Sequence, residues 1–228
     1  MFRSKIALAT LAGLLLATTA FANSLAATTA AAVEGTYGLE LTYDGAANNF
    51  FVLDQSPDAE KTYRASFWIE EGTLQMTNCG PTCSTQFMLL AAQQATNGKT
   101  VLRIIVGRMV TDDGTGERHL YRFSVKNDND NFLYVGGIIL NGAVVRKHVT
   151  IEWQSGDPGV ANGVARLYTS NDGGTPNLQG ELFYQNSLYQ IDQISIGGIA
   201  GLGDQASDSL TNGTLHFDSF ESYRTLLP

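Results

Sequence analysis

The feature that most constrains this chain is a repeated pattern of short alternating apolar and polar runs, each ended by a turn sequence. Residues 37–43 alternate until Asp44-Gly45, and residues 65–70 alternate until Gly72. Side chains of a strand point alternately to its two faces, so this period of two predicts strands. Similar or continuously apolar runs follow at 86–90, 101–106, 119–125, 132–140, 147–153, 164–169, 189–197 and 213–223. About ten strands, without a clear 3.6-residue period, predict a single all-β domain that is either a sandwich or a barrel.

Two of these runs predict how their side chains are placed. In residues 147–153, Trp153 shares a face with the other apolar residues, so we expect it in the core. In the last run the alternation slips before Phe220. A β-bulge near Asp218 or Ser219 would absorb this slip.

The N-terminus has the features of a secretory signal peptide. Arg3 and Lys5 precede an uncharged apolar run from Ile6 to Ala17, and Ala20-Phe21-Ala22 offers small residues at a cleavage site. The apolar run is shorter than the roughly 20 residues that span a bilayer, which makes a retained anchor the less favoured alternative. We predict a signal peptide at 1–22, a disordered or further processed Ala/Thr-rich segment at 23–34, and one domain at 35–228. The mature chain is expected in the periplasm or outside the cell, without membrane insertion.

The charge balance limits the class of partner. The formal net charge of −8 becomes −10 when Arg3 and Lys5 are removed with the signal peptide. Like-charge repulsion then argues against a nucleic acid or an anionic membrane as partner.

The two cysteines, Cys79 and Cys83, lie in the short sequence CGPTC. Export favours a disulfide, and Gly80-Pro81 suits the tight turn that so small a loop needs. A zinc site would need more ligands than this segment offers. The spacing also differs from the C-x-x-C of thiol oxidoreductases.

Several segments carry a family resemblance. KHVTIEWQSG followed by GVARLYTSNDG, and later YQIDQISIGGI and NGTLHFDSFESYR, resemble strands of the concanavalin A-like (laminin G-like) lectin/glucanase superfamily, in particular its secreted bacterial members. The resemblance implies an all-β, antiparallel jelly-roll sandwich of two sheets, one of them concave, with ligand loops at its rim. Members of this superfamily bind glycans or proteins, or cleave polysaccharides, so the resemblance alone does not fix a function.

Known catalytic patterns are not recognisable in the sequence. The glucanase motif E-x-D-x-x-E is absent, since Asp192 has no Glu at the required offsets. Polysaccharide-lyase motifs of the same fold and the nucleophile motif G-x-S-x-G are also missing. His216 and Asp218 would share a strand face, but a strand-surface role is the simpler interpretation for this pair. The sequence therefore predicts a protein that is not an enzyme.

Calcium is the cofactor that the sequence suggests. Residues 126–131 (KNDNDN) place Asp128 and Asp130 in one tight turn, and hard cations prefer such oxygen ligands. Asp218 matches, by the resemblance, a position where related jelly rolls hold structural calcium. The alternative is that Asp and Asn simply favour turns.

A sugar site would need exposed aromatic side chains with polar groups nearby. The residues whose strand phase allows this are Trp68, Tyr121, Tyr134 and Tyr168, with Arg166 as a hydrogen-bond donor. Strand aromatics also serve as core or cross-strand pairs. We predict a secreted non-catalytic lectin-like domain that binds a polysaccharide or glycoconjugate through its concave face. The alternatives are a structural or adhesive module that contacts proteins and, more weakly, a polysaccharide-active enzyme without recognisable motifs; the sugar and the oligomeric state stay open.

Overall fold

The computed structural model describes residues 23–45, 49–76, 86–110, 117–140, 146–202 and 211–227. Across these ranges the chain is all-β, with fourteen strands. The described ranges contain no helix able to cross a membrane. The predicted fold class, an antiparallel two-sheet sandwich, is confirmed.

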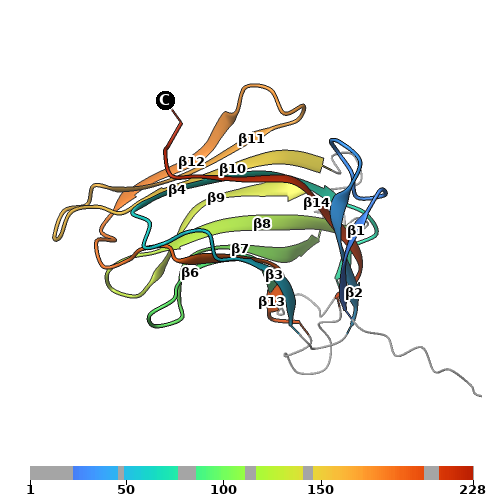
Figure 1. Cartoon of the computed structure of the whole chain (residues 1–228), viewed down its shortest axis with the longest axis horizontal. Helices are drawn as coiled ribbons and strands as arrows, with labels where there is room; N and C mark the ends of the chain where they lie inside the picture. The colour runs from blue at the N-terminus through green and yellow to red at the C-terminus, as the bar shows by residue number, and fades with distance from the viewer. Residues whose placement is uncertain are drawn as a thin grey trace, which may run out of the picture.

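The strands form two layers, which Figure 1 shows one above the other. The eight-stranded sheet has the order β1 (Ser24–Thr28), β2 (Gly38–Asp44), β14 (Thr211–Tyr223), β4 (Thr62–Glu71), β10 (Arg146–Gln154), β11 (Gly163–Ser170) and β12 (Asn177–Tyr184), with β5 (Gln75–Met76) beside β14. The six-stranded sheet has the order β3 (Phe50–Asp54), β13 (Gln193–Ala200), β6 (Gln86–Gln94), β7 (Lys99–Val110), β8 (Glu117–Lys126) and β9 (Phe132–Leu140). Neighbouring strands pair antiparallel in both sheets.

The core lies between the two sheets and is built from one phase of each strand. In β10, Val149, Ile151 and Trp153 are buried, and Trp153 is 0% exposed. In β8, Tyr121 and Phe123 meet them from the other sheet as part of the same cluster. The prediction that Trp153 is a core residue is confirmed.

The predicted bulge in the last strand is also confirmed. The register between β14 and β4 shifts between Asp218 and Glu221, and Ser219 has a positive φ of 50°. The extra residue returns Phe220 to the inner face, where its ring stacks on Phe67 with centroids 6.2 Å apart. The bulge therefore keeps both halves of this long strand in contact with the core.

The expectation of a disordered segment at 23–34 is wrong for most of that range. Residues 24–28 form β1 and pair with β2. The Asp218 carboxylate then accepts hydrogen bonds from the backbone N–H groups of Val33 (2.7 Å) and Glu34 (2.6 Å). These long-range partners order a segment whose own composition gives no strand signal.

We expect Trp153→Ala to lower the free energy of unfolding by about 3–5 kcal/mol, because it opens a large cavity between the sheets. Urea denaturation checks this, with Leu188→Ala, at a position that is 65% exposed, as the matched control. Similar losses for both variants would contradict the assignment of Trp153 to the core.

Candidate functional site

The outer face of the six-stranded sheet carries two arginines because their neighbours belong to the core. In β7, Leu102 and Ile104 point inward, so Arg103 between them points outward. In β8, Arg122 lies between inward-pointing residues in the same way. The antiparallel register sets Arg103 opposite Ser124 and Arg122 opposite Ile105, so the two guanidinium groups lie on one face of neighbouring strands.

A hollow of about 410 Å³ surrounds these arginines. It is lined by Gln86, Arg103, Ile105, Arg122, Ser124, Phe132 and Tyr134. A second hollow of about 160 Å³ adjoins it, since both share Gln86, Arg103 and Ile105, and it extends to Ala200 and Gly201 at the end of β13. We call the two together the basic groove; it crosses the strands from β9 to β13.

A third hollow, of about 310 Å³, lies between the open edges of the two sheets. Its lining is mostly apolar, with Leu39, Val52 and Phe217 among its residues. Because it holds few groups able to bind charge or move a proton, we place the candidate site in the basic groove.

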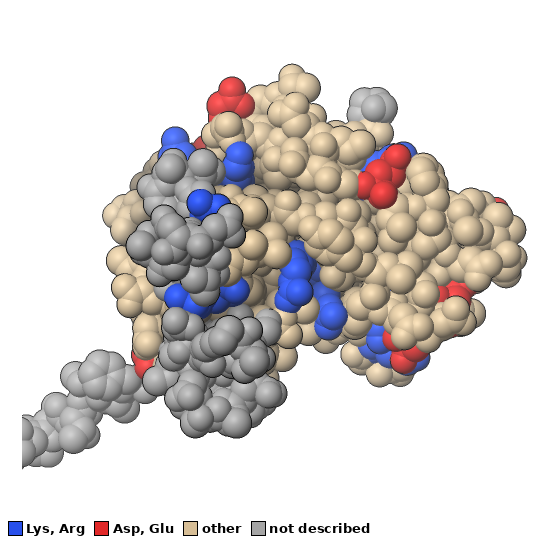
Figure 2. All heavy atoms as spheres, turned by 180° about the vertical axis from the view of Figure 1, so that it is seen from behind, with Lys and Arg blue, Asp and Glu red and all other residues tan. Residues whose placement is uncertain are grey.

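Neither arginine forms an ion pair with an acidic side chain of the described residues. The Arg122 guanidinium donates a hydrogen bond to Gln86 Oε1. Arg103 Nε is buried and has no acceptor among the described residues. Burial, followed by the charge of Arg122, lowers the pKa of Arg103. The described side chains of β6, β7, β8 and β9 include no Asp or Glu, and Figure 2 shows Lys and Arg side chains in a hollow with the acidic side chains elsewhere on that face.

Tyr134 brings a phenol group to the same place. Its side chain is 59% exposed, and it stands opposite Ser124 in the register of β8 and β9. A Cβ atom on Gly137 would lie 2.8 Å from the Tyr134 hydroxyl oxygen. Gly137 is paired in register with Arg122, so the Tyr134 hydroxyl lies over Gly137 and beside Arg122. A side chain at position 137 would occupy the space that this hydroxyl fills.

Phe132 closes the β9 end of the groove. The Arg103 guanidinium carbon lies 3.5 Å from the centroid of its ring. Lys126 Nζ lies 4.9 Å from the same centroid. The ring is therefore engaged by two cations and is not a free platform for a sugar.

Of the predicted sugar-binding residues, the structure brings only Tyr134 to the groove. The expectation that Trp68 and Tyr121 are exposed is wrong, since they are 3% and 1% exposed. Trp68 lies on the outer face of the eight-stranded sheet, in edge contact with His148 at 5.3 Å between ring centroids. Tyr121 points into the core and donates a hydrogen bond of 2.6 Å to Glu71.

Arg166 and Tyr168 lie on the outer face of the eight-stranded sheet, away from the groove. Arg166 pairs with Glu181 (2.5 Å) and with the fully buried Glu152 (3.4 Å). Tyr168 donates a hydrogen bond of 3.3 Å to Glu152. Hydrogen bonding to Glu181 raises the pKa of Arg166. Arg166 thus neutralises the buried Glu152 carboxylate, and Tyr168 adds a hydrogen bond to it.

The residues that the sequence reasoning missed are Gln86, Arg103, Arg122 and Phe132. A signal was present in residues 101–106 and 119–125, where a single arginine interrupts an apolar strand pattern. An arginine in that position must face outward, since an unpaired charge in the core is costly. Two such arginines on neighbouring strands predict a basic face.

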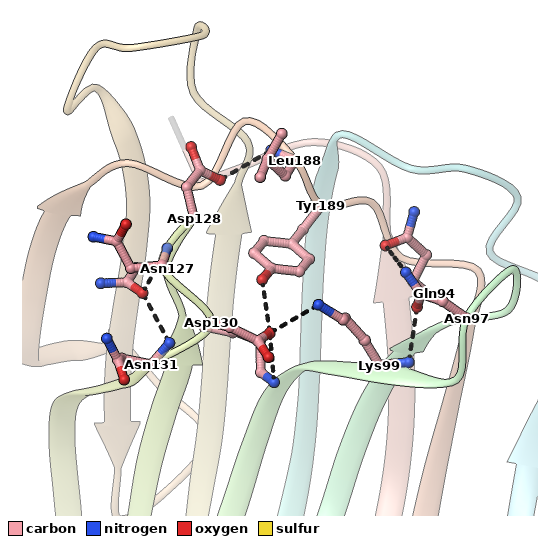
Figure 3. A network of polar contacts seen from close by, with 11 residues as sticks. Gln94, Asn97, Lys99, Asn127, Asp128, Asp130, Asn131, Leu188 and Tyr189 are labelled. Atoms are coloured by element: carbon pink, nitrogen blue, oxygen red, sulfur yellow. Dashed lines mark hydrogen bonds and ion pairs between the residues drawn. The ribbon is translucent and has the colours of Figure 1, made fainter.

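The turn between β8 and β9, the predicted calcium turn, is held by hydrogen bonds within the chain, as Figure 3 shows. The Asp128 carboxylate accepts hydrogen bonds from the backbone N–H groups of Ser187 (3.1 Å) and Leu188 (3.0 Å). Asp130 Oδ1 accepts bonds from Lys99 (3.1 Å), Lys126 (3.0 Å) and Tyr189 (3.1 Å). These bonds lower the pKa of Asp130 to about 2. The described residues show no cluster of three or more metal-ligating side chains.

Calcium stays a prediction for Asp128, Asp130 and Asp218. A calcium ion bound only to the folded protein must raise its melting temperature. Comparing melting curves with a chelator and with added calcium checks it, and superimposed curves would contradict it. The predicted disulfide between Cys79 and Cys83 and the signal peptide lie outside the described residues.

Comparisons with known proteins show the fold. No family model matches the chain, and no curated protein matches its sequence. Among solved structures, an endo-β-1,4-glucuronan lyase from the fungus Trichoderma reesei matches with a TM-score of 0.52 and 11% identity, over 88% of this chain and 86% of that one. The cellulose induced protein Cip1 matches with a TM-score of 0.52 and 17% identity, over 89% and 86% of the two chains. An alginate lyase from Aplysia kurodai gives 0.46 and 10% over 88% and 87%.

The match with the glucuronan lyase corrects the functional expectation from the sequence. A non-catalytic lectin-like domain was expected because the glucanase motif is absent. The fold is instead shared, over nearly the whole length of both chains, with a polysaccharide lyase. The missing glucanase motif therefore gives no ground for predicting a protein that is not an enzyme, because it tests for a different reaction. At 11% identity, lyase motifs need not be recognisable in the sequence.

We expect Asp130→Asn to lower the melting temperature at neutral pH and to lose this effect in acid. The pKa of Asp130 is depressed to about 2 by Lys126, Lys99 and Tyr189. Its stabilising contribution is therefore complete above the ordinary Asp pKa of about 3.9 and disappears as the pH falls through about 2. Melting temperatures from pH 7 to pH 2 check this, with the exposed Asp58→Asn as the control. A pH-independent difference would contradict it.

Proposed function

We propose that this protein is a polysaccharide lyase that cleaves a uronate-containing polysaccharide by β-elimination in the basic groove. The observation that carries the proposal is the pair Arg103 and Arg122, which share one face and form no ion pair with any described carboxylate. In an acidic protein, arginines that lie in a hollow without an acidic partner among the described side chains suit an anionic ligand. The shared fold with a glucuronan lyase supports a uronate as that anion.

The substrate's carboxylate is the group that the two arginines would bind. A guanidinium group offers planar paired donors that match a carboxylate, and hydrogen bonds between charged groups are the strong ones. Gln86, which already contacts Arg122, adds an amide donor at the same place. Drawing negative charge away from the carboxylate makes the hydrogen on the adjacent C5 carbon easier to remove, because the carbanion-like transition state places its charge there.

Tyr134 is the residue that we assign to proton transfer. Its hydroxyl lies beside Arg122 and is open to the groove. As a phenolate it acts as the base: it takes the proton from C5 and becomes a phenol, the C4–C5 double bond forms, and the bond from C4 to the glycosidic oxygen breaks. The leaving oxygen then accepts a proton from the same phenol or from water, which balances the reaction.

The shape of the groove favours a polymer over a single sugar. It crosses the strands from Phe132 at one end to Gly201 at the other, so substrate units can extend on both sides of the arginines. Membership of the concanavalin A-like superfamily and export from the cell belong to the same proposal, since an extracellular polysaccharide requires a secreted enzyme.

A panel of uronate polymers and neutral glucans tests the proposal. We expect ultraviolet absorbance from the new C4–C5 double bond, together with new reducing ends, on one or more uronate polymers and on no neutral glucan. Absence of this product on every uronate polymer would overturn the proposal.

The variant Tyr134→Phe removes the proton-transferring oxygen and keeps the ring. We expect kcat to fall by about 10²- to 10⁴-fold, the usual contribution of a general acid or base, with little change in substrate affinity. Tyr37→Phe, at another exposed tyrosine, is the matched control and should retain full activity. A Tyr134→Phe enzyme as active as the control would assign proton transfer to another group.

A further inference from the structure

Phe132 lies at the β9 end of the basic groove, where its ring contacts two cations. It is the first residue of β9, where it is paired in register with Lys126 of β8. Arg103 reaches its ring from β7, two strands away, to within 3.5 Å of the centroid. A cation over an aromatic face is attracted by the negative charge of that face.

The contact with the Phe132 ring is the interaction that the described residues show for the Arg103 guanidinium. No hydrogen bond or ion pair joins it to a described residue, and its Nε atom is buried without an acceptor. Burial and, to a smaller extent, repulsion by Arg122 lower the pKa of Arg103. A flexible arginine in that environment needs an attractive contact to stay in the groove, and an acidic partner would occupy the donors that a ligand needs.

The ring itself is held from the β8 side. Lys126 Nζ lies 4.9 Å from the ring centroid and 3.0 Å from Asp130 Oδ1. Asp130 in turn accepts bonds from Lys99 and Tyr189 in the turn network of Figure 3. A continuous set of contacts therefore runs from the turn between β8 and β9 to the guanidinium of Arg103.

We propose that Phe132 is a positioning residue that holds Arg103 in the groove through its aromatic face, so that the guanidinium donors stay free for a substrate carboxylate. The role for substrate rests on the proposed function. An aromatic ring can do this where an acid cannot, because it attracts the cation without accepting its N–H groups. Because the guanidinium donors stay free, the groove would prefer substrate units with a free carboxylate over neutral or esterified units.

The first test needs no substrate. Phenylglyoxal reacts with accessible arginines, and peptide mass spectrometry gives the rate at Arg103 with Arg122 as the internal reference. We expect Phe132→Leu to raise the rate at Arg103 about three- to thirtyfold, the range that a cation–π contact supports, and Phe132→Tyr to restore it. Phe183→Leu, at an exposed phenylalanine of the other sheet, is the matched control and should change neither rate. An unchanged rate at Arg103 in Phe132→Leu overturns the proposal.

The second test uses the uronate polymer that the wild type cleaves. We expect Phe132→Leu to raise KM by a factor in the same range with a smaller change in kcat, and Phe132→Tyr to behave as the wild type. Equal KM values for Phe132→Leu and the Phe183→Leu control would overturn the substrate role. If the wild type cleaves no uronate polymer, the proposed function fails, whereas the phenylglyoxal rates still decide whether Phe132 holds Arg103.

Discussion

Side-chain alternation in the paired strands β7 and β8 is the constraint on which both the core and the groove depend. Leu102 and Tyr121 pack inward, and the fixed two-residue period then directs Arg103 and Arg122 outward. Backbone hydrogen bonds between the strands keep the two guanidinium groups on one face despite their repulsion. The free energy of core packing thus maintains a concentration of positive charge that these arginines would not form by themselves.

Local signals in the sequence predict the parts of the fold that local structure determines. The bounds of β9 match the run at 132–140, and the phase slip before Phe220 predicts the bulge at Ser219. The strands β1, β3, β5 and β12 are missed, and β13 begins later than expected. The residues of β1 are mostly Ala and Thr, and those of β3 are few and uniformly exposed or half-buried. Such strands exist because β2 and β13 offer them hydrogen-bonding edges, which a local pattern does not contain.

The candidate site depends still more on long-range pairing. Tyr134 was predicted from its strand phase, but its proximity to Arg122 follows from the register of β8 and β9 and from the space above Gly137. Gln86 reaches the groove from β6, far away in the sequence. A motif search tests residues at fixed spacing on one strand, whereas this site takes one side chain from each of several neighbouring strands. The lectin-like prediction rested on the absence of such a motif, and the fold shared with a glucuronan lyase overturns it.

Arg103 and Arg122, which form no ion pair with a described carboxylate, also affect how the protein behaves in solution. With burial and repulsion both acting on Arg103, the free groove stores an electrostatic cost that any small multivalent anion can relieve. If the groove binds a uronate as proposed, we expect phosphate, sulfate and citrate to bind the same donors and to compete with it. Their choice and concentration decide how much of the groove is available to a polymer in any experiment with this protein.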